Sequence, residues 1–207
     1  MGSTADRILA EATRLFAQRG YEGTSVRAIC EAAGANVNAV SYHFGSKQAL
    51  YTTVIERFGG KNLESAKRIL GRPPKDLSDF ESRLLLFAEE LLGTYLAHPE
   101  PLIICFNEWQ QSFRHCDGKA TTESLLEQTN VLVAFLRAAQ RRRILRPGLD
   151  LEIIAGALLE RLMNQVRYAN AIHLIYDVSI REQTYRRHWT ERTIDLLLHG
   201  AVRKAQD

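Results

Sequence analysis

Residues 7–51 read RILAEATRLFAQRGYEGTSVRAICEAAGANVNAVSYHFGSKQALY, and this segment has the most informative pattern in the chain. Apolar residues recur every three or four positions in its first part, which predicts a helix that ends near Gly20. Two shorter helices are predicted at 25–33 and 36–44, with Gly34 in the turn between them. Two short helices joined by a glycine-containing turn have the dimensions of a helix-turn-helix. Any short helix pair can share this spacing, however, so the spacing alone is weakly specific.

The second short helix begins with residues that could approach a DNA major groove closely. In a helix-turn-helix the second helix enters that groove, and its first residues face the base edges. Asn36 and Asn38 carry amides that could pair with adenine, while Val37 and Ala39 could contact a thymine methyl group. The start of this helix therefore indicates base reading.

Groups that hold phosphates follow directly in the sequence. Residues 41–43 (Ser-Tyr-His) and 46–47 (Ser-Lys) supply hydroxyls, an imidazole and an ammonium group. No Asp or Glu occurs in residues 32–55, so this stretch carries no carboxylate that would repel a phosphate.

Four motifs in the same stretch carry a resemblance to a known family. They are A-x-x-L-F-x-x-x-G-Y at 12–21, T-S-V-R-x-I at 24–29, A-G-A-N-V at 33–37 and Y-H-F-x-S-K at 42–47. Together they closely resemble the DNA-binding domain of the tetracycline-repressor (TetR) family. Cys30, Ala39 and Ser41 depart from the residues common in that family, and the last two positions bear on which bases are read.

The resemblance implies a role for each matching position. The residues implied to face bases or the nearest phosphates are Asn36, Val37, Asn38, Ala39 and Ser41. The residues implied to hold the DNA backbone are Thr24, Ser25, Arg27, Tyr42, His43 and Lys47. For Tyr42 the alternative is core packing, and for His43 it is a simple role at the helix C-terminus. The residues predicted to form the apolar core of the three-helix head are Ala12, Leu15, Phe16, Val26, Ile29, Val40 and Phe44.

The remainder of the chain continues the helical pattern, and strand alternation is nearly absent. Ser46 is predicted to cap a long helix over 46–71, in which Gly59 and Gly60 form a weak point where the helix could bend. A capping box at 78–81 (Ser-Asp-Phe-Glu) is predicted to open the next helix.

Two helices are expected near the end of the chain, one over 151–172 that is capped by Asp150 and one over 186–202. We therefore expect an all-α protein of about nine helices. Its N-terminal part, residues 1–50, is predicted to be a three-helix helix-turn-helix DNA-binding domain. The larger part, residues 51–207, is predicted to be a helical domain for effector binding and dimerisation.

The resemblance further implies a homodimer and a small-molecule effector that the sequence does not identify. The helices at 151–172 and 186–202 would pair with the same helices of a second copy; the alternative is that they form only an intrachain core. Aromatic walls with a few polar groups are typical of a ligand cavity. The candidates to line one are Phe106, Trp109, Phe113, Phe135, Met163, Asn164, Arg167 and Tyr168. The alternatives are plain core packing for the aromatic residues and, for Arg167, an ion pair with Glu160 or Asp177.

The composition excludes some classes of protein but does not identify a function. The 207 residues include 27 basic and 24 acidic ones, and the net charge of +3 allows nucleic-acid binding without indicating it. No apolar run approaches the ~18 residues of a membrane-spanning helix, and we expect none. The N-terminus lacks the pattern of a secretory signal, and the 3 cysteines form no C-x-x-C pair, so we expect a reduced, cytoplasmic setting. A redox-sensing cysteine is the alternative use of these thiols.

Other classes of function find little support in the sequence. The motifs G-x-S-x-G, H-E-x-x-H and the P-loop are absent, so we expect neither catalytic residues nor a cofactor. His115, Cys116 and Asp117 lack the spacing of a known metal site, and we expect no metal. The sequence therefore predicts a DNA-binding transcriptional regulator, a ligand-released repressor that binds a near-palindromic double-stranded operator as a dimer. The alternative is a small-molecule-binding helical protein that acts through protein partners rather than DNA.

Overall fold

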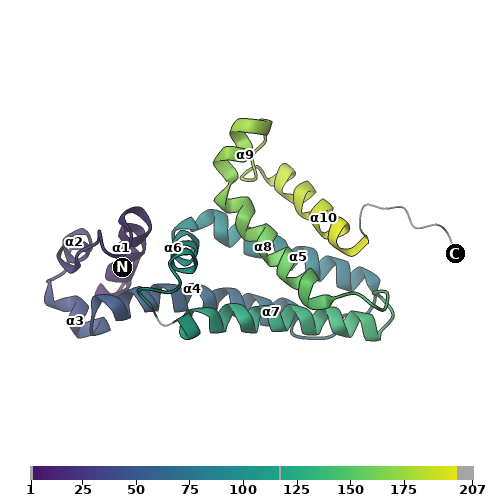
Figure 1. Ribbon diagram of the computed structural model, residues 1–207, viewed down its shortest axis with the longest axis horizontal. Helices are drawn as coiled ribbons and strands as arrows, with labels where there is room; N and C mark the ends of the chain where they lie inside the picture. The colour runs from purple at the N-terminus through teal and green to yellow at the C-terminus, as the bar shows by residue number, and fades with distance from the viewer. Residues whose placement is uncertain (1, 117, 200–207) are drawn as a thin grey trace. The chain divides into compact units, whose positions relative to one another are not determined.

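The computed structural model describes residues 2–116 and 118–199, and within them it contains ten helices and no strand (Figure 1). The helices are α1 (Thr4–Arg19), α2 (Val26–Ala32), α3 (Asn38–Phe44), α4 (Lys47–Leu70), α5 (Leu77–Ala97), α6 (Pro99–Gln110), α7 (Gly118–Arg141), α8 (Leu151–Arg167), α9 (Ala169–Tyr176) and α10 (Gln183–His199). The predicted all-α fold is confirmed.

The tenth helix arises because the helix predicted over 151–172 is two helices. Tyr168, with φ −101° and ψ 10°, lies between the end of α8 and the start of α9. Neither glycine nor proline marks this break, and the apolar pattern continues through it, so the sequence predicted a single helix. The last helix begins at Gln183, earlier than predicted, and its predicted end at Val202 lies outside the described residues.

The chain divides into two compact units. The first consists of Met1–Leu63 and His98–Leu126, and the second consists of Glu64–Ala97 and Glu127–Asp207. The first unit therefore combines the three-helix head with α6 and with parts of α4 and α7. The predicted boundary at residue 50 does not coincide with the division into compact units, and a functional boundary there stays a prediction.

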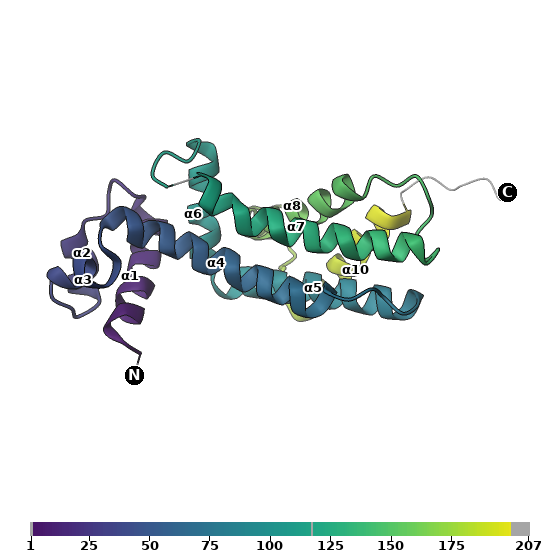
Figure 2. The same ribbon diagram turned by 90° about the horizontal axis from the view of Figure 1, so that it is seen from below.

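The core of the first unit joins the head to α6. Helix α1 packs against α2, α3 and α6, and Figure 2 shows α1, α2 and α3 beside the start of α4. The buried residues of this core are Ile8, Leu9, Ala12, Leu15, Phe16, Ile29, Cys30, Ala33, Val40, Leu50, Tyr51, Val54, Ile55, Ile104, Cys105 and Cys116. Every residue predicted for the core of the head packs there, although Val26 and Phe44 are only partly buried.

Local hydrogen bonds and one glycine set the ends of α1. The Ser3 hydroxyl accepts a hydrogen bond from the Asp6 N–H at 3.1 Å, and the Asp6 carboxylate accepts one from the Ser3 N–H at 3.3 Å. This reciprocal pair is a capping box. Gly20 ends the helix, as predicted, with φ +71° and ψ 177°, a conformation that is essentially restricted to glycine.

Helix α4 follows its prediction closely. The Ser46 hydroxyl accepts a hydrogen bond from the Ala49 N–H at 3.0 Å and so caps the helix. The helix then continues through Gly59 and Gly60 to Leu70 as one element.

The start of α5 corrects a prediction. The capping box predicted at 78–81 is wrong, because the helix already begins at Leu77. Asp76 accepts a hydrogen bond from the Asp79 N–H at 2.9 Å, and Asp79 accepts one from the Lys75 N–H at 2.8 Å. Asp caps a helix about as well as Ser does, so the earlier aspartate takes the position.

The second unit packs α5 against α8 and α10, which also contact each other. Its largest buried side chains include Phe80 and Phe135, whose rings stack with centroids 5.5 Å apart. Asp150 caps α8 as predicted, accepting a hydrogen bond from the Ile153 N–H at 2.9 Å. Helix α9, in contrast, contributes no buried residue. Among the residues that the structure describes, no helix combines the length and the apolar character needed to cross a membrane.

Candidate nucleic-acid interface

The turn between α2 and α3 has the geometry of a helix-turn-helix. The Ser25 hydroxyl caps α2 by accepting a hydrogen bond from the Ala28 N–H at 3.1 Å. Gly34 has φ +59°, which lets the chain reverse after α2. The Asn36 side-chain oxygen then accepts the Asn38 N–H at 2.9 Å, so α3 begins at Asn38, two residues later than predicted.

The start of α3 is an exposed polar surface. Asn36, Asn38 and Ser41 are exposed, and Val37 is 48% exposed. Ala39 is half-buried because it packs against the core of the head. These five predicted base-reading positions thus lie on one short segment, and which bases they contact stays a prediction.

Most of the residues predicted to hold the DNA backbone are also exposed. Tyr42 is 85% exposed, so the alternative that it packs in the core is wrong. His43 is exposed beside it, and the two rings meet edge to face with centroids 4.8 Å apart. Ser25 and Arg27 are exposed as well, and Arg27 pairs with Glu31 at 2.9 Å. A phosphate would have to compete with that carboxylate for the guanidinium.

Thr24 differs from the other predicted backbone contacts because it is 1% exposed. Its hydroxyl donates toward the Gly20 carbonyl at 2.8 Å and lies 3.2 Å from the Leu15 carbonyl. Its N–H donates to the Tyr21 carbonyl at 3.3 Å. These bonds tie the end of α1 to the start of α2, so the side chain supports the head from inside, and its contact with DNA stays a prediction.

Lys47 lies against an aromatic ring at the first residue of α4. Its Nζ atom is 4.1 Å from the centroid of the Tyr21 ring, within the range of a cation–π interaction. Within residues 2–116 and 118–199 no carboxylate forms an ion pair with Lys47. The ammonium group therefore keeps its hydrogen-bond donors for another partner.

A buried carboxylate that the sequence reasoning missed lies in the same unit. Glu108 on α6 is 1% exposed. Its Oε1 accepts the Tyr51 hydroxyl at 2.8 Å and lies 2.9 Å from His115 Nδ1. Its Oε2 accepts the His115 N–H at 3.2 Å and the Cys116 thiol at 3.4 Å. A single carboxylate within the apolar stretch of α6 was the signal that could have identified it.

The hydrogen bonds to Glu108 decide its charge. Burial raises the pKa of Glu108, but the hydrogen bonds from His115, Tyr51 and Cys116 outweigh it, so the pKa lies below its ordinary value. Burial and the bond to Glu108 both raise the pKa of Tyr51, which therefore keeps its proton. The site is thus a buried, ionised carboxylate surrounded by donors.

The surroundings of the cysteines bear on the two uses that were considered for these thiols, metal binding and redox sensing. Asp117 lies outside the described residues, and within them no group of three or more His, Cys, Asp or Glu side chains is arranged to hold a metal ion. The three cysteines are buried. Burial raises the pKa of Cys105 to about 12, which keeps that thiol protonated and unreactive.

The residues predicted to line an effector pocket divide between the two units. Phe106, Trp109 and Phe113 belong to the first unit, and the other five, Phe135, Met163, Asn164, Arg167 and Tyr168, belong to the second. Phe135 is part of the core of the second unit, which agrees with the alternative that the aromatic residues pack in the core. The Arg167 guanidinium lies 5.5 Å from the Tyr168 ring centroid. That these eight residues share a cavity stays a prediction.

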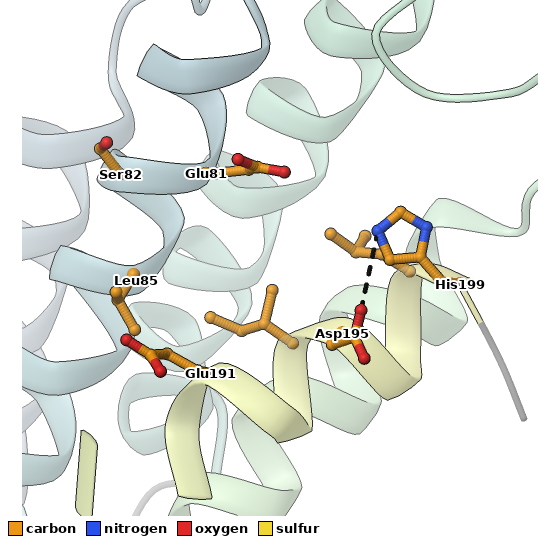
Figure 3. Close-up of a pocket in the computed structure, with 8 residues that line it drawn as sticks. Glu81, Ser82, Leu85, Glu191, Asp195 and His199 are labelled. Atoms are coloured by element: carbon orange, nitrogen blue, oxygen red, sulfur yellow. Dashed lines mark ion pairs between the residues drawn. The ribbon is translucent and has the colours of Figure 1, made fainter. Parts of the chain in front are cut away.

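A groove of about 280 Å³ lies in the second unit between α5 and α10 (Figure 3). Its apolar floor is formed by Leu85, Ile194 and Leu198, and Glu81, Ser82, Glu191, Asp195 and His199 surround it. None of the predicted effector residues lines this groove.

Comparison with known proteins agrees with the geometry. Residues 8–54 match the family described as bacterial regulatory proteins, tetR family. The transcriptional repressor NicS of Pseudomonas putida is 26% identical over 204 residues, which cover 97% of this chain and 93% of NicS. The probable transcriptional regulator YttP of Bacillus subtilis is 42% identical over 67 residues, 31% of this chain and 32% of YttP.

Solved structures of regulators share the fold along nearly the whole chain. The TetR family transcriptional regulator PfmR of Thermus thermophilus aligns with a TM-score of 0.75 and 21% identity, covering 99% of this chain and 100% of PfmR. FadR of Bacillus subtilis, solved with stearoyl-CoA, aligns with a TM-score of 0.74 and 16% identity, covering 95% and 99%. With the helix-turn-helix, its exposed α3 and the four motifs in place, residues 8–54 are similar to the tetR family of bacterial regulatory proteins, and the fold along nearly the whole chain is that of the solved regulators.

Proposed function

We propose that the protein is a transcriptional repressor that binds a near-palindromic DNA operator as a homodimer and leaves it when a small molecule binds. One observation carries the DNA-binding part: the exposed amides at the start of α3 lie in a segment, residues 32–55, without a carboxylate. Such a surface can approach base edges without repelling phosphates. Residues 1–50 would bind the operator, and residues 51–207 would bind the effector and the second copy inside the bacterial cytoplasm.

The dimer is proposed to form through α8 and α10. Ile153 on α8 and Leu196 on α10 are 67% and 47% exposed in the single chain. Gly156 has open space around its α-carbon, so another helix could approach α8 closely there. A two-fold dimer would present its two α3 helices to successive major grooves about 34 Å apart, which is why the operator should be near-palindromic.

The effector would act through a preference for the conformer that does not bind DNA. A hundredfold loss of operator affinity corresponds to about 2.7 kcal/mol of coupling between the two sites. The FadR neighbour was solved with stearoyl-CoA, which supports a ligand-binding role for this fold. A thermal-shift screen of small molecules, followed by a DNA-release assay on the hits, would identify the effector of this chain.

Replacing Lys47 by Ala tests the phosphate contact. We expect binding to weaken for all DNA sequences alike, and the slope of log affinity against log salt to fall by about 0.9, because the variant neutralises one phosphate fewer. Lys61 on the same helix is exposed, so Lys61→Ala is the matched control and should leave the slope unchanged. An unchanged slope for Lys47→Ala would remove this residue from the DNA contacts.

Replacing Asn38 by Ala tests base reading. The variant should bind non-specific DNA as tightly as the wild type but select a less defined site from random DNA, with a loss of about 1–3 kcal/mol in discrimination at one base pair. Identical selected sites for variant and wild type would contradict the role. A wild-type protein that binds no duplex DNA at low salt would overturn the proposed function itself.

A further inference from the structure

We propose that Tyr21 is a positioning residue for DNA binding, which holds the Lys47 ammonium in place and is itself held by His115 and Glu108. The inference rests on the proposed DNA-binding function. These four residues come from three parts of the first unit: the end of α1, the start of α4, and α6 with the segment that follows it.

The Lys47 ammonium group lies over the Tyr21 ring. A lysine side chain has a flexible four-carbon stem, so fixing it on a phosphate costs conformational entropy. The Tyr21 ring, 4.1 Å from Nζ, restricts that stem before DNA arrives. The ring attracts the ammonium through its π face and leaves the three N–H donors available. Because its stem is already restricted, Lys47 loses less conformational entropy when it binds a phosphate.

The Tyr21 ring packs against three other rings. His115 stacks on it with centroids 4.6 Å apart and an interplanar angle of 27°. Tyr51 meets it edge to face at 5.0 Å, and Phe16 lies 6.0 Å away. Since Phe16 and Tyr51 are buried in the core, the ring is fixed on more than one side.

The His115 ring is held by two carboxylates, those of Glu108 and Glu22. Its Nδ1 lies 2.9 Å from the buried Glu108 carboxylate, and its Nε2 lies 3.4 Å from the carboxylate of the exposed Glu22. The distance to Glu22 suits an ion pair, although the alignment is not that of a hydrogen bond. The imidazole thus bridges α6 and the turn after α1. The plane of the ring that stacks on Tyr21 is therefore set by Glu108.

A double-mutant cycle separates positioning from ordinary packing. The full-length protein is titrated with a duplex that the wild type has selected from random DNA, at several salt concentrations. We expect Tyr21→Leu and Lys47→Ala each to weaken binding about five- to tenfold and to lower the salt slope by up to about 0.9. The double variant should be no weaker than Lys47→Ala alone, because both changes act on the same interaction with DNA. Tyr21→Phe keeps the ring and should retain the wild-type affinity and slope.

Failure of the proposed role of Tyr21 can be distinguished from failure of the proposed DNA binding. The positioning role would be overturned if the two losses of DNA affinity multiply in the double variant. It would also be overturned if Tyr21→Leu keeps the wild-type salt slope, and in both cases the proposed DNA binding would stand. A gain of affinity in Tyr21→Leu would also overturn it, since the ring would then compete with the phosphate. A wild type that binds no duplex would overturn the proposed function, and the inference with it.

A second variant protects the test against loss of folding. If circular dichroism shows that Tyr21→Leu is unfolded, His115→Gln takes its place in the cycle, since Gln can still bond to Glu108 but offers no ring to stack. It should lower the salt slope and show no further loss when combined with Lys47→Ala. His98→Gln, at the exposed start of α6, is the matched control and should behave as the wild type. A His115→Gln protein with the wild-type slope would contradict the proposal.

Discussion

Glu108 illustrates how one buried residue can determine the stability of its surroundings. An ionised carboxylate away from water is tolerated only when donors replace the water that solvated it. Here the Tyr51 hydroxyl, the Cys116 thiol and two groups of His115 do so. Removing the carboxylate would leave the buried Tyr51 hydroxyl and the His115 groups without this acceptor, and each unsatisfied group costs free energy.

We therefore predict that Glu108→Ala lowers the free energy of unfolding by about 2–4 kcal/mol. Urea denaturation at pH 7 measures it. Glu56→Ala, at an exposed position on α4, is the control and should change the value by less than about 0.5 kcal/mol. An equal effect of the two substitutions would mean that the buried hydrogen bonds contribute nothing to stability.

The same carboxylate predicts a pH dependence. The pKa of Glu108 is lowered in the folded protein, while an unfolded Glu titrates near a pKa of about 4.3. Its contribution to stability is therefore present above about pH 4.3 and is lost as the pH falls further, through the folded pKa. The stability advantage of the wild type over Glu108→Gln should shrink as the pH falls below about 4.3. A difference that stays constant down to about pH 3 would refute this.

At the scale of single residues, the sequence predicted features that depend on near neighbours in the chain. It did not predict contacts between residues that are far apart in the chain. The exposure of Asn38 agrees with its own polarity, whereas the exposed position of Tyr42 was implied by the family resemblance and not by its own chemistry. The bond between Tyr51 and Glu108 joins residues 57 positions apart, and no local pattern predicts it. The burial of Thr24 was missed for a similar reason, since its hydroxyl bonds across the turn to α1.

At the scale of elements, helix ends were predictable wherever a single capping residue was available. Ser46 and Asp150 cap α4 and α8 as expected. Where two good caps compete, as at the start of α5, the sequence alone did not decide which one the helix uses. The break at Tyr168 has no composition signal at all, so α9 could not be predicted as a separate helix.

The cap at Asp150 gives a prediction for α8. Asp150→Ala removes the acceptor of the Ile153 N–H and should lower stability by about 1 kcal/mol. Asp150→Asn keeps an acceptor at the same place and should lose only a few tenths of a kcal/mol. Urea midpoints of the two variants and the wild type measure the effect. Equal midpoints for Ala and Asn would show that the hydrogen bond does not stabilise the helix.

At the scale of the whole molecule, the proposed dimer makes a prediction about mass. Light scattering at micromolar concentration should give twice the chain mass of 23.5 kDa. Leu196→Glu places a charge on the proposed interface and should shift the protein to the monomer, since an unpaired buried charge is costly. Leu77 is exposed to a similar extent, at 53%, but lies on α5, so Leu77→Glu should remain a dimer. A wild-type protein with the mass of one chain would exclude the dimer.

The set of bonds around Glu108 also bears on how this protein can vary during evolution. Tyr51, His115 and Cys116 all bond to the same two oxygen atoms, so a substitution at Glu108 removes a hydrogen bond from each of them at once. A lineage without this carboxylate should therefore have replaced its partners too, by apolar residues of similar volume. In an alignment of descendants of one ancestor, we expect these four positions to be inherited together and to change together.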